Sequence, residues 1–371
     1  METFGSCPRR HLLRYGLDLF PAETFAFQRN EQGTFNHDVL KLFLDAAMKL
    51  PEWPDLPDQQ VSRLLNAVLR ERVKQWEGGV LRSDIAHRYQ GVAIIRGIRT
   101  SIASLMRSFQ QKPHFLPMAA EIPFGMPDGS SPLNLPAIQI QLSDGRNVAF
   151  SGRIDRIDRL ELPDGKRYFL IVDNKMSPKE VKQNAIVAGL QLQLPLYIRA
   201  AQNGLSGFAA AGGLYQPIKD VLVSGTDPGQ IRTQIDRELQ TSGIILDDQA
   251  VQEAMKPVKI ARRSESNDVL SAVSPDELQT VMDFALHVVA ERVERIRAGE
   301  TAPAPLQDGL ESPCAWCDHP DACPYDATLP GCRIRELDHR HRMELKFAED
   351  GYDTVFPVSS DFRGRPSHAE I

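Results

Sequence analysis

The sequence predicts an α/β fold in which helices flank a central sheet, and three observations lead to this class. The first third of the chain repeats apolar residues at helical spacing. From about residue 113 the pattern changes to short runs rich in β-formers, separated by turn signals such as SDGRN and LPDGK. One of these runs, YFLIV at 168–172, is apolar at every position, which is typical of a strand covered on both faces at the centre of a sheet.

Helices are expected on both sides of the strand-rich region. Before it, helical patterns cover residues 33–50, 58–76 and 83–109. After it, a capping box at Ser274 and Glu277 starts a long helix. The strands between these helices are expected to form an antiparallel meander that leads into YFLIV, and GFAAAGGLYQPI predicts one further strand.

We expect five parts along the chain. They are a helical N-terminal part (1–112), a catalytic core (113–225), a helical insertion with a long helix (226–300), a cysteine segment (301–335), and a C-terminal helix with a tail (336–371).

The composition is that of an ordinary globular protein. Of 371 residues, 42% are hydrophobic and 25% are charged. The net charge of −6 argues against a surface that coats nucleic acid nonspecifically, although it leaves room for a local basic groove. No apolar run approaches the roughly 18 to 20 residues of a membrane span, and the start lacks a signal-peptide pattern. We therefore expect a cytoplasmic protein without membrane association.

The most informative stretch for chemistry is VDNK, directly after the buried apolar run. Asp173 and Lys175 alternate across Asn174, so both side chains lie on one face at the end of the strand. A structural ion pair is the simplest explanation of such a pair. In SGRIDRIDRL, however, Asp155 lies on the strand expected to pair with this one, so a divalent ion between the two carboxylates is the rival explanation.

The residues of this region suit Mg²⁺ or Mn²⁺. Asp155 and Asp173 supply hard oxygen ligands, and the backbone carbonyl of Asn174 offers a third oxygen. Lys175 is then placed to orient or deprotonate a water, or to stabilise charge on a phosphate. His37 lies on a predicted helix, where a single histidine is more often structural than a metal ligand.

One helix carries a polar pair at i and i+4. Gln193 and Tyr197 share a helix face in LQLQLPLY, where they are suited to position DNA or the lysine. Surface polar residues are the more frequent explanation of such a pair when it is seen alone.

Taken together, GTFNH, GRID, VDNK and QLPLY, in that order, resemble the RecB/AddB-type nucleases of the PD-(D/E)XK superfamily. The opening ETFGSCPRRHLLRYGLDL and the closing CAWCDHPDACPYD are similar to the two ends of AddB-type nuclease domains, so the resemblance covers roughly residues 1–335. It implies an α/β fold with a restriction-endonuclease-like mixed central sheet flanked by helices. Each motif alone is weak, whereas four in order, bracketed by cysteines, are specific.

The resemblance also assigns roles to residues. It implies that His37, Asp155 and Asp173 are metal ligands and that Lys175 is the catalytic lysine, with Gln193 and Tyr197 in support.

Four further residues agree with or depart from the family pattern. Glu121 lies where the family often has a strand glutamate, and Asp158 is expected to lie outside the metal's own ligands. The departures are Asn174 and Met176, where the usual run is DYK followed by a small hydroxyl residue.

The activity implied is metal-dependent hydrolysis of DNA phosphodiesters, acting as an exonuclease or on single-stranded ends, in repair, recombination or defence. These residues contain no P-loop GxxxxGK[ST], so they are not expected to power unwinding. The chain is expected to act alone, as CRISPR-associated spacer-acquisition nucleases do, or with a helicase subunit. The alternative is a noncatalytic DNA-binding or scaffolding subunit with a structural zinc site. The motifs do not choose a polarity, and they leave restriction-like or RNA-directed cutting open.

The five cysteines indicate metal or cluster ligation more than disulfides, because four of them lie within nineteen residues and no export signal is present. The resemblance implies a [4Fe–4S] cluster held by Cys7, Cys314, Cys317 and Cys323, which fastens the two ends of the domain together. The alternative is a local zinc site in which Cys332 replaces Cys7, or in which His319 takes part.

Overall fold

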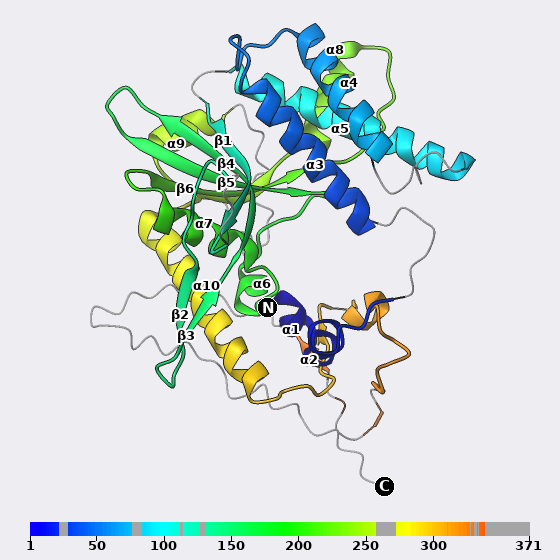
Figure 1. The fold of residues 1–371 in the computed structure, drawn as a ribbon, viewed down its shortest axis with the longest axis vertical. Coiled ribbons are helices and arrows are strands. Elements are labelled where there is room, and N and C mark those ends of the chain that lie inside the picture. Colours follow the sequence, from blue (N-terminus) through cyan, green and yellow to red (C-terminus); the bar gives the residue numbers. More distant parts are fainter. Residues whose placement is uncertain are drawn as a thin grey trace.

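A computed structural model gives the fold (Figure 1). The residues that it describes are 1–21, 29–75, 84–111, 114–126, 131–256, 272–309, 311–326, 328–329, 332 and 334–337.

A six-stranded mixed sheet forms the centre of the molecule, which confirms the predicted fold class. The strands, in order across the sheet, are β1 (Leu116–Phe124), β4 (Gly152–Glu161), β5 (Arg167–Lys175), β6 (Ala209–Pro217), β7 (Ser242–Leu246) and β8 (Ala272–Val273). The pairs β1–β4, β4–β5 and β6–β7 are antiparallel, β7–β8 is parallel, and the parallel pair β5 and β6 lies in the middle.

Strand β5 is buried along almost its whole length, as its apolar run predicts. Residues 168–174 are all buried, and helices cover the sheet on both sides (Figure 1). A run without polar alternation is stable only where both faces of a strand are covered. The polar residues that end this strand therefore emerge from a dry interior.

The expected meander differs from the observed pairing. β1 pairs with β4, while β2 (Ile138–Gln141) and β3 (Asn147–Phe150) form a separate two-stranded ribbon. The sequence IQIQ alternates buried and exposed residues, so β2 has only one apolar face. That face packs towards α7 (Gln193–Gly204) and α10 (Pro275–Arg297), and a strand of this kind does not suit the interior of the main sheet.

Three long helices form a lobe beside the sheet, in the regions where helical spacing predicts them. They are α3 (Arg29–Ala47), α4 (Asp58–Gln75) and α5 (Ile85–Phe109). They share an apolar cluster of their own, which includes Phe35 and Phe43. The lobe therefore holds α3, and the residues on it, firmly against the β1 side of the sheet.

The other side of the sheet carries α6 (Gln183–Val187), α7 and α10 (Figure 1). Helix α10 begins with the predicted capping box, in which Ser274 Oγ accepts from Glu277 N at 3.2 Å and Glu277 Oε2 accepts from Ser274 N at 2.6 Å.

Residues 226–270, expected as a helical insertion, contain both helices and a strand. Helices α8 (Pro228–Glu238) and α9 (Gln249–Met255) flank β7, which extends the central sheet. The sequence of β7, SGIIL, is wholly buried and too short for its periodicity to separate a strand from a buried helix. Residues 257–271 lie outside the described part of the chain.

The two ends of the described chain meet beside α10. The N-terminal segment (residues 1–16) consists of α1 (Glu2–Ser6), α2 (Pro8–His11) and η1 (Leu12–Gly16). Arg335, in the short strand β10 (Arg335–Glu336), donates from Nη2 to Gly5 O at 2.7 Å and to Ser6 O at 3.2 Å. Arg10 pairs with Asp318 at 3.3 Å.

The remaining part of the cysteine segment is mostly irregular. Its short elements are β9 (Leu306–Gln307), which pairs with β10, and the 3₁₀ helix η3 (Pro313–Trp316). The sequence predicts a C-terminal helix and tail over residues 336–371. Glu336, the first residue of that range, ends strand β10, and residues 338–371 lie outside the described part of the chain. Among the described helices, none combines the length and apolar character that crossing a bilayer requires.

Candidate active site

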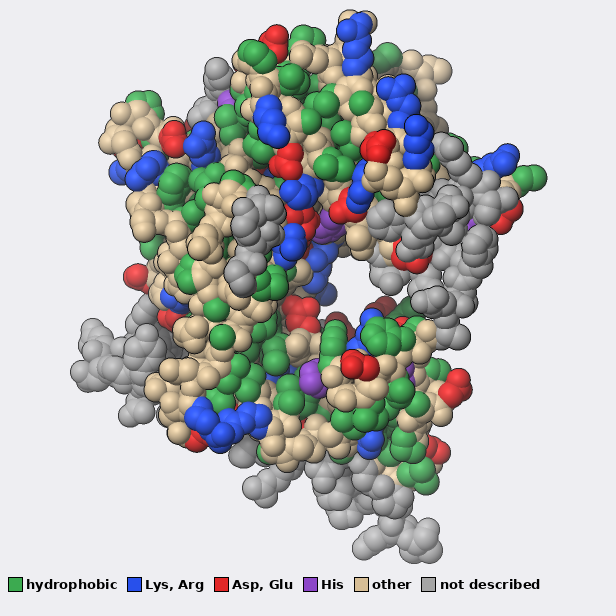
Figure 2. Space-filling view, in the orientation of Figure 1, with side chains coloured by type: hydrophobic (Ala, Val, Ile, Leu, Met, Phe, Trp, Pro, Cys, Tyr) green, Lys and Arg blue, Asp and Glu red, His purple; other side chains and the backbone are tan. Residues whose placement is uncertain are grey.

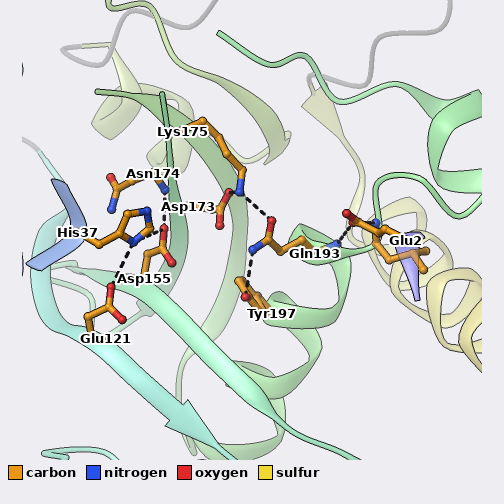
Figure 3. A network of polar contacts seen from close by, with 10 residues as sticks. Glu2, His37, Glu121, Asp155, Asp173, Asn174, Lys175, Gln193 and Tyr197 are labelled. Carbon is orange, nitrogen blue, oxygen red and sulfur yellow. Dashed lines mark hydrogen bonds and ion pairs between the residues drawn. The ribbon is translucent and has the colours of Figure 1, made fainter. Parts of the chain in front are cut away.

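Three adjacent strands bring three carboxylates to one place. In the antiparallel register Arg156 pairs with Val172, so Asp155 is next to Asp173 on the neighbouring strand. On the other side, Ala120 pairs with Arg156 and Ile122 with Ile154, which puts Glu121 opposite Asp155. Figure 3 shows the three side chains converging.

The two aspartates are deeply buried. Asp155 is 9% exposed and Asp173 is 1% exposed. Asp155 Oδ2 accepts a hydrogen bond from Asn174 N at 2.7 Å. Asp173 Oδ1 has no hydrogen-bond partner among the described residues. A buried carboxylate oxygen with no donor is costly unless a cation or another donor meets it.

His37 reaches the carboxylates from α3. Its Nδ1 lies 3.2 Å from Glu121 Oε1 and 3.4 Å from Asp155 Oδ2. One donor atom from each of these three residues lies within 4.8 Å of the others, and no other group of His, Cys, Asp or Glu in the described ranges is as compact. Glu121 has φ of 53°, which is unusual for a strand residue other than glycine and indicates a locally constrained backbone.

The protonation of the cluster reflects its burial. Burial, with Asp173 adding to it, raises the pKa of Asp155 to about 7, against the opposing effect of His37. Burial also raises the pKa of Asp173, although Lys175 opposes it. For His37, burial lowers the pKa, but Glu121, Asp155 and Asp173 together raise it above its ordinary value. Burial is thus the main cause of the raised pKa of the two aspartates, whereas the neighbouring carboxylates raise the pKa of His37.

This donor set fits a hard divalent cation. Carboxylate oxygens are what Mg²⁺ prefers, and imidazole is acceptable to Mn²⁺ beside carboxylates. The unpaired Asp173 oxygen and the compact His37, Glu121 and Asp155 group are where such an ion would be held.

Lys175 emerges on the same face as Asp173, as the strand alternation predicts. Its Nζ lies 2.5 Å from Asp173 Oδ2 and donates to Gln193 Oε1 at 2.8 Å. Gln193 Nε2 donates in turn to the Tyr197 hydroxyl at 3.1 Å. The predicted i and i+4 pair thus forms a chain of hydrogen bonds that ends on the lysine.

The side chains of two further residues of these strands lie on the opposite face of the sheet from Asp155 and Asp173. The side chain of Asn174 is buried on the opposite face from Asp173, and its backbone N–H supports Asp155. Asp158 is three residues from Asp155 and so also faces the other way, where it forms a buried pair with Arg156 at 2.7 Å. Asp158 therefore belongs to the packing of the sheet.

The sequence patterns did not single out two charged residues near the lysine. Glu2 Oε1 accepts from Leu192 N at 2.7 Å and from Gln193 N at 3.2 Å. Lys179 Nζ lies 4.7 Å from the centre of the Tyr215 ring, and burial lowers the pKa of Lys179.

Of these two residues, only Glu2 could have been inferred, from the need of α7 for an acceptor at its start. The start of α7 has no side-chain cap of its own, so its free N–H groups require an acceptor from elsewhere in the chain. For Lys179 we find no comparable signal.

The cysteines gather where the two chain ends meet. None of the five, all of which the structure describes, forms a disulfide, and Cys7 is buried. Burial raises the pKa of Cys323, and Cys7 and Cys317 add smaller contributions through their charge. Ser6 O accepts from Arg335 Nη2 at 3.2 Å and Arg10 pairs with Asp318 at 3.3 Å, so Cys7 is near the cysteine segment despite its distance in sequence. Cys332 Sγ lies 3.9 Å from Pro324 O.

The surface is hollowed between the helical lobe and the N-terminal segment. Figure 2 shows Lys and Arg side chains beside Asp and Glu side chains around this hollow. Charges of both signs therefore lie around this hollow, on a chain whose net charge is −6.

The chain matches the PD-(D/E)XK nuclease superfamily over residues 1–324. It is similar to one subunit of the ATP-dependent helicase/deoxyribonuclease of Moorella thermoacetica, with 28% identity over 359 residues that cover 91% of this chain and 30% of that protein. The corresponding subunit of the Symbiobacterium thermophilum protein is 30% identical over 355 residues, with coverage of 91% and 30%. This chain thus spans 30% of the length of either relative.

The superfamily match extends through the helical lobe, the sheet and α10, and it includes every residue of the polar cluster. The mixed sheet flanked by helices agrees with it. The chain belongs to the PD-(D/E)XK nuclease superfamily.

Proposed function

We propose that this chain is a deoxyribonuclease unit that hydrolyses DNA phosphodiester bonds with Mg²⁺ or Mn²⁺ at the His37, Glu121, Asp155 and Asp173 cluster. The observation that carries the proposal is the convergence of these carboxylates with Lys175 in a buried network. The superfamily and the deoxyribonuclease named in the relatives support it.

The residues divide into two roles. His37, Asp155 and Asp173 hold the metal ion, and Glu121 joins them because it lies in the same compact group as His37 and Asp155. The backbone carbonyl of Asn174 remains a proposed further ligand. When bound, the ion supplies Lewis-acid chemistry and activates a water at neutral pH.

Lys175 acts on the phosphate and the water. Its ammonium group lies 2.5 Å from Asp173, where it stabilises negative charge that develops on the phosphate or orients the attacking water. Gln193 Oε1 accepts a hydrogen bond from Nζ and so fixes the direction of Nζ. Tyr197 fixes Gln193 in turn.

DNA is the proposed substrate, cut from its ends or as single strands. The local Lys and Arg side chains around the hollow suit a polyanion (Figure 2). The relatives are named as subunits of a helicase/deoxyribonuclease, which supports a helicase partner. Such a partner would supply the unwinding that these residues are not expected to power.

A [4Fe–4S] cluster on Cys7, Cys314, Cys317 and Cys323 is the second part of the proposal, with structural zinc as the alternative. The approach of Cys7 to Cys317 and Cys323 supports it, since Cys7 and Cys317 both influence the pKa of Cys323. Arg335 and Arg10 hold the same two chain segments together. Thiolates are the usual ligands of such clusters.

Cleavage of end-labelled linear DNA with Mn²⁺ tests the activity. We expect Lys175→Ala to lose at least about a hundredfold in rate, because the charge next to the phosphate is removed. Lys166→Ala is the matched control, since Lys166 lies in the turn before the same strand and forms a surface ion pair with Asp164 at 3.6 Å. Equal cleavage by wild type and Lys175→Ala would overturn the proposal.

A further inference from the structure

We propose that Glu2 is a positioning residue, which holds the catalytic lysine in place by capping the start of α7. This inference rests on the proposed function of Lys175. Glu2 lies 190 residues away in sequence from the first of the two backbone groups that it binds.

The start of α7 needs an acceptor from outside the helix. Its N-cap residue is Leu192, which has no side-chain oxygen, and the first N–H groups of a helix have no partners within it. Glu2 Oε1 accepts from Leu192 N at 2.7 Å and from Gln193 N at 3.2 Å. A carboxylate there also interacts favourably with the positive end of the helix.

Gln193 links this cap to the lysine. Its backbone N–H is held by Glu2, while its side chain accepts from Lys175 Nζ at 2.8 Å and donates to Tyr197 at 3.1 Å. Figure 3 shows Glu2 on one side of Gln193 and Lys175 on the other. The position of the Gln193 amide, and through it the direction of Nζ, therefore depends on the cap.

Glu2 is itself on a fixed support. Phe4 is 1% exposed, and a Cβ atom at Gly5 would lie 2.6 Å from Arg292 Nη1 and 2.8 Å from Gly189 O, so α1 packs closely against its neighbours. Arg335 holds the last carbonyl groups of α1. A rigid support allows a carboxylate to fix another group instead of following it.

The test compares Glu2→Ala with Glu2→Gln. Glutamine keeps the acceptor oxygen and the reach, whereas alanine removes both. We expect Glu2→Ala to lower kcat roughly ten- to a hundredfold with little change in KM, and Glu2→Gln to restore most of kcat. The second readout, made without DNA or metal, is the rate at which an acylating reagent labels Lys175, followed by peptide mass spectrometry. We expect this labelling rate to rise severalfold in Glu2→Ala and to return to the wild-type value in Glu2→Gln.

Asp248→Ala is the control for the loss of a helix cap, and it also removes the acceptor of the Tyr168 hydroxyl, which lies 3.2 Å from Asp248 Oδ2. Asp248 Oδ1 accepts from Ala250 N at 2.9 Å and from Val251 N at 3.1 Å, so it likewise caps a helix, α9, through two backbone N–H groups. The Asp248→Ala variant should reduce thermal stability as Glu2→Ala does, without changing kcat or the labelling of Lys175. If Glu2→Ala unfolds the protein, Glu2→Asp replaces it, because aspartate keeps the charge but is one methylene group too short.

The outcomes separate this inference from the proposed function. Unchanged labelling of Lys175 in a folded Glu2→Ala protein, or an equal rise in Asp248→Ala, would overturn the role of Glu2. Failure of the wild type to cut DNA would remove the proposed function, and the labelling would still decide whether Glu2 positions Lys175.

Discussion

The carboxylate of Asp155 accepts a hydrogen bond from the backbone N–H of Asn174 at 2.7 Å, so β4 and β5 are joined at the residue that carries the raised pKa. This bond fixes one aspartate beside the other while both remain buried. Two buried carboxylates repel each other, and their proximity favours either a proton or a cation between them. The arrangement is therefore suited to bind a metal ion and is unfavourable without one.

The first prediction concerns the stability of the metal-free protein. The pKa of Asp155 is about 7 in the folded state, above an unfolded value of ~3.9, so its contribution to stability is present at low pH and is lost as pH rises through about 7. Asp155→Asn should raise the free energy of unfolding at pH 8 by roughly 2 to 4 kcal/mol, and by much less at pH 5. Urea unfolding in EDTA measures both.

Asp158→Asn provides the contrast. Asp158 is buried against Arg156, so its replacement leaves a buried cation without its partner and should destabilise the protein at both pH values. An Asp155→Asn protein that is less stable than the wild type at pH 8 would contradict the electrostatic account of the cluster.

The second prediction concerns metal binding and pH. The same raised pKa means that a proton must leave Asp155 below pH 7 before the ion binds, so Mn²⁺ affinity should increase by up to about tenfold per pH unit between pH 5 and 7 and then level off. Titration calorimetry in several buffers measures both the affinity and the protons released. An affinity independent of pH in this range would be inconsistent with binding at Asp155.

The third prediction concerns Glu121. If it completes the metal site, Glu121→Gln should weaken Mn²⁺ binding roughly tenfold or more. Glu161→Gln is the control, because Glu161 is an exposed residue of β4 that pairs with Arg159 at 3.6 Å. Equal Mn²⁺ affinity in the two variants would place Glu121 outside the metal site.

The fourth prediction concerns the cysteines. Purification without oxygen should give brown protein that contains iron, and Cys7→Ala should lose the colour while Cys332→Ala keeps it. Iron and zinc analysis of each variant measures the difference. Colourless, zinc-loaded protein that tolerates Cys7→Ala would favour the zinc alternative.

The fifth prediction concerns the N-terminal segment. Phe4 is 1% exposed, so Phe4→Ala should cost about 3 to 5 kcal/mol of stability. Tyr15→Ala, at a residue that is 60% exposed on the same segment, should cost far less. Thermal unfolding of both proteins decides whether this segment is integral to the domain, as we expect, or loosely attached.

The features that were predictable from sequence are the local ones. The buried strand YFLIV and the shared face of Asp173 and Lys175 follow from the period of a strand. The pair Gln193 and Tyr197 follows from the period of a helix. In each case neighbouring residues carry the whole pattern.

The features that were missed depend on distant parts of the chain. Strand β1 pairs with β4 and so brings Glu121 to the cluster. The expected meander does not include this pairing, because the β2 and β3 ribbon lies between the two strands in the sequence. Glu2 reaches α7 only because the N-terminal segment is packed against α10 and the cysteine segment. No local periodicity encodes such contacts.

The most direct test of the central claim is one cleavage series on end-labelled linear DNA, in which EDTA removes the metal and Mn²⁺ restores it, with wild type and Asp155→Asn side by side. We predict that wild-type cleavage stops in EDTA and resumes with Mn²⁺, while Asp155→Asn stays inactive at every Mn²⁺ concentration. Cleavage that continues in EDTA, or that proceeds equally in Asp155→Asn, would contradict a metal-dependent nuclease site at this cluster.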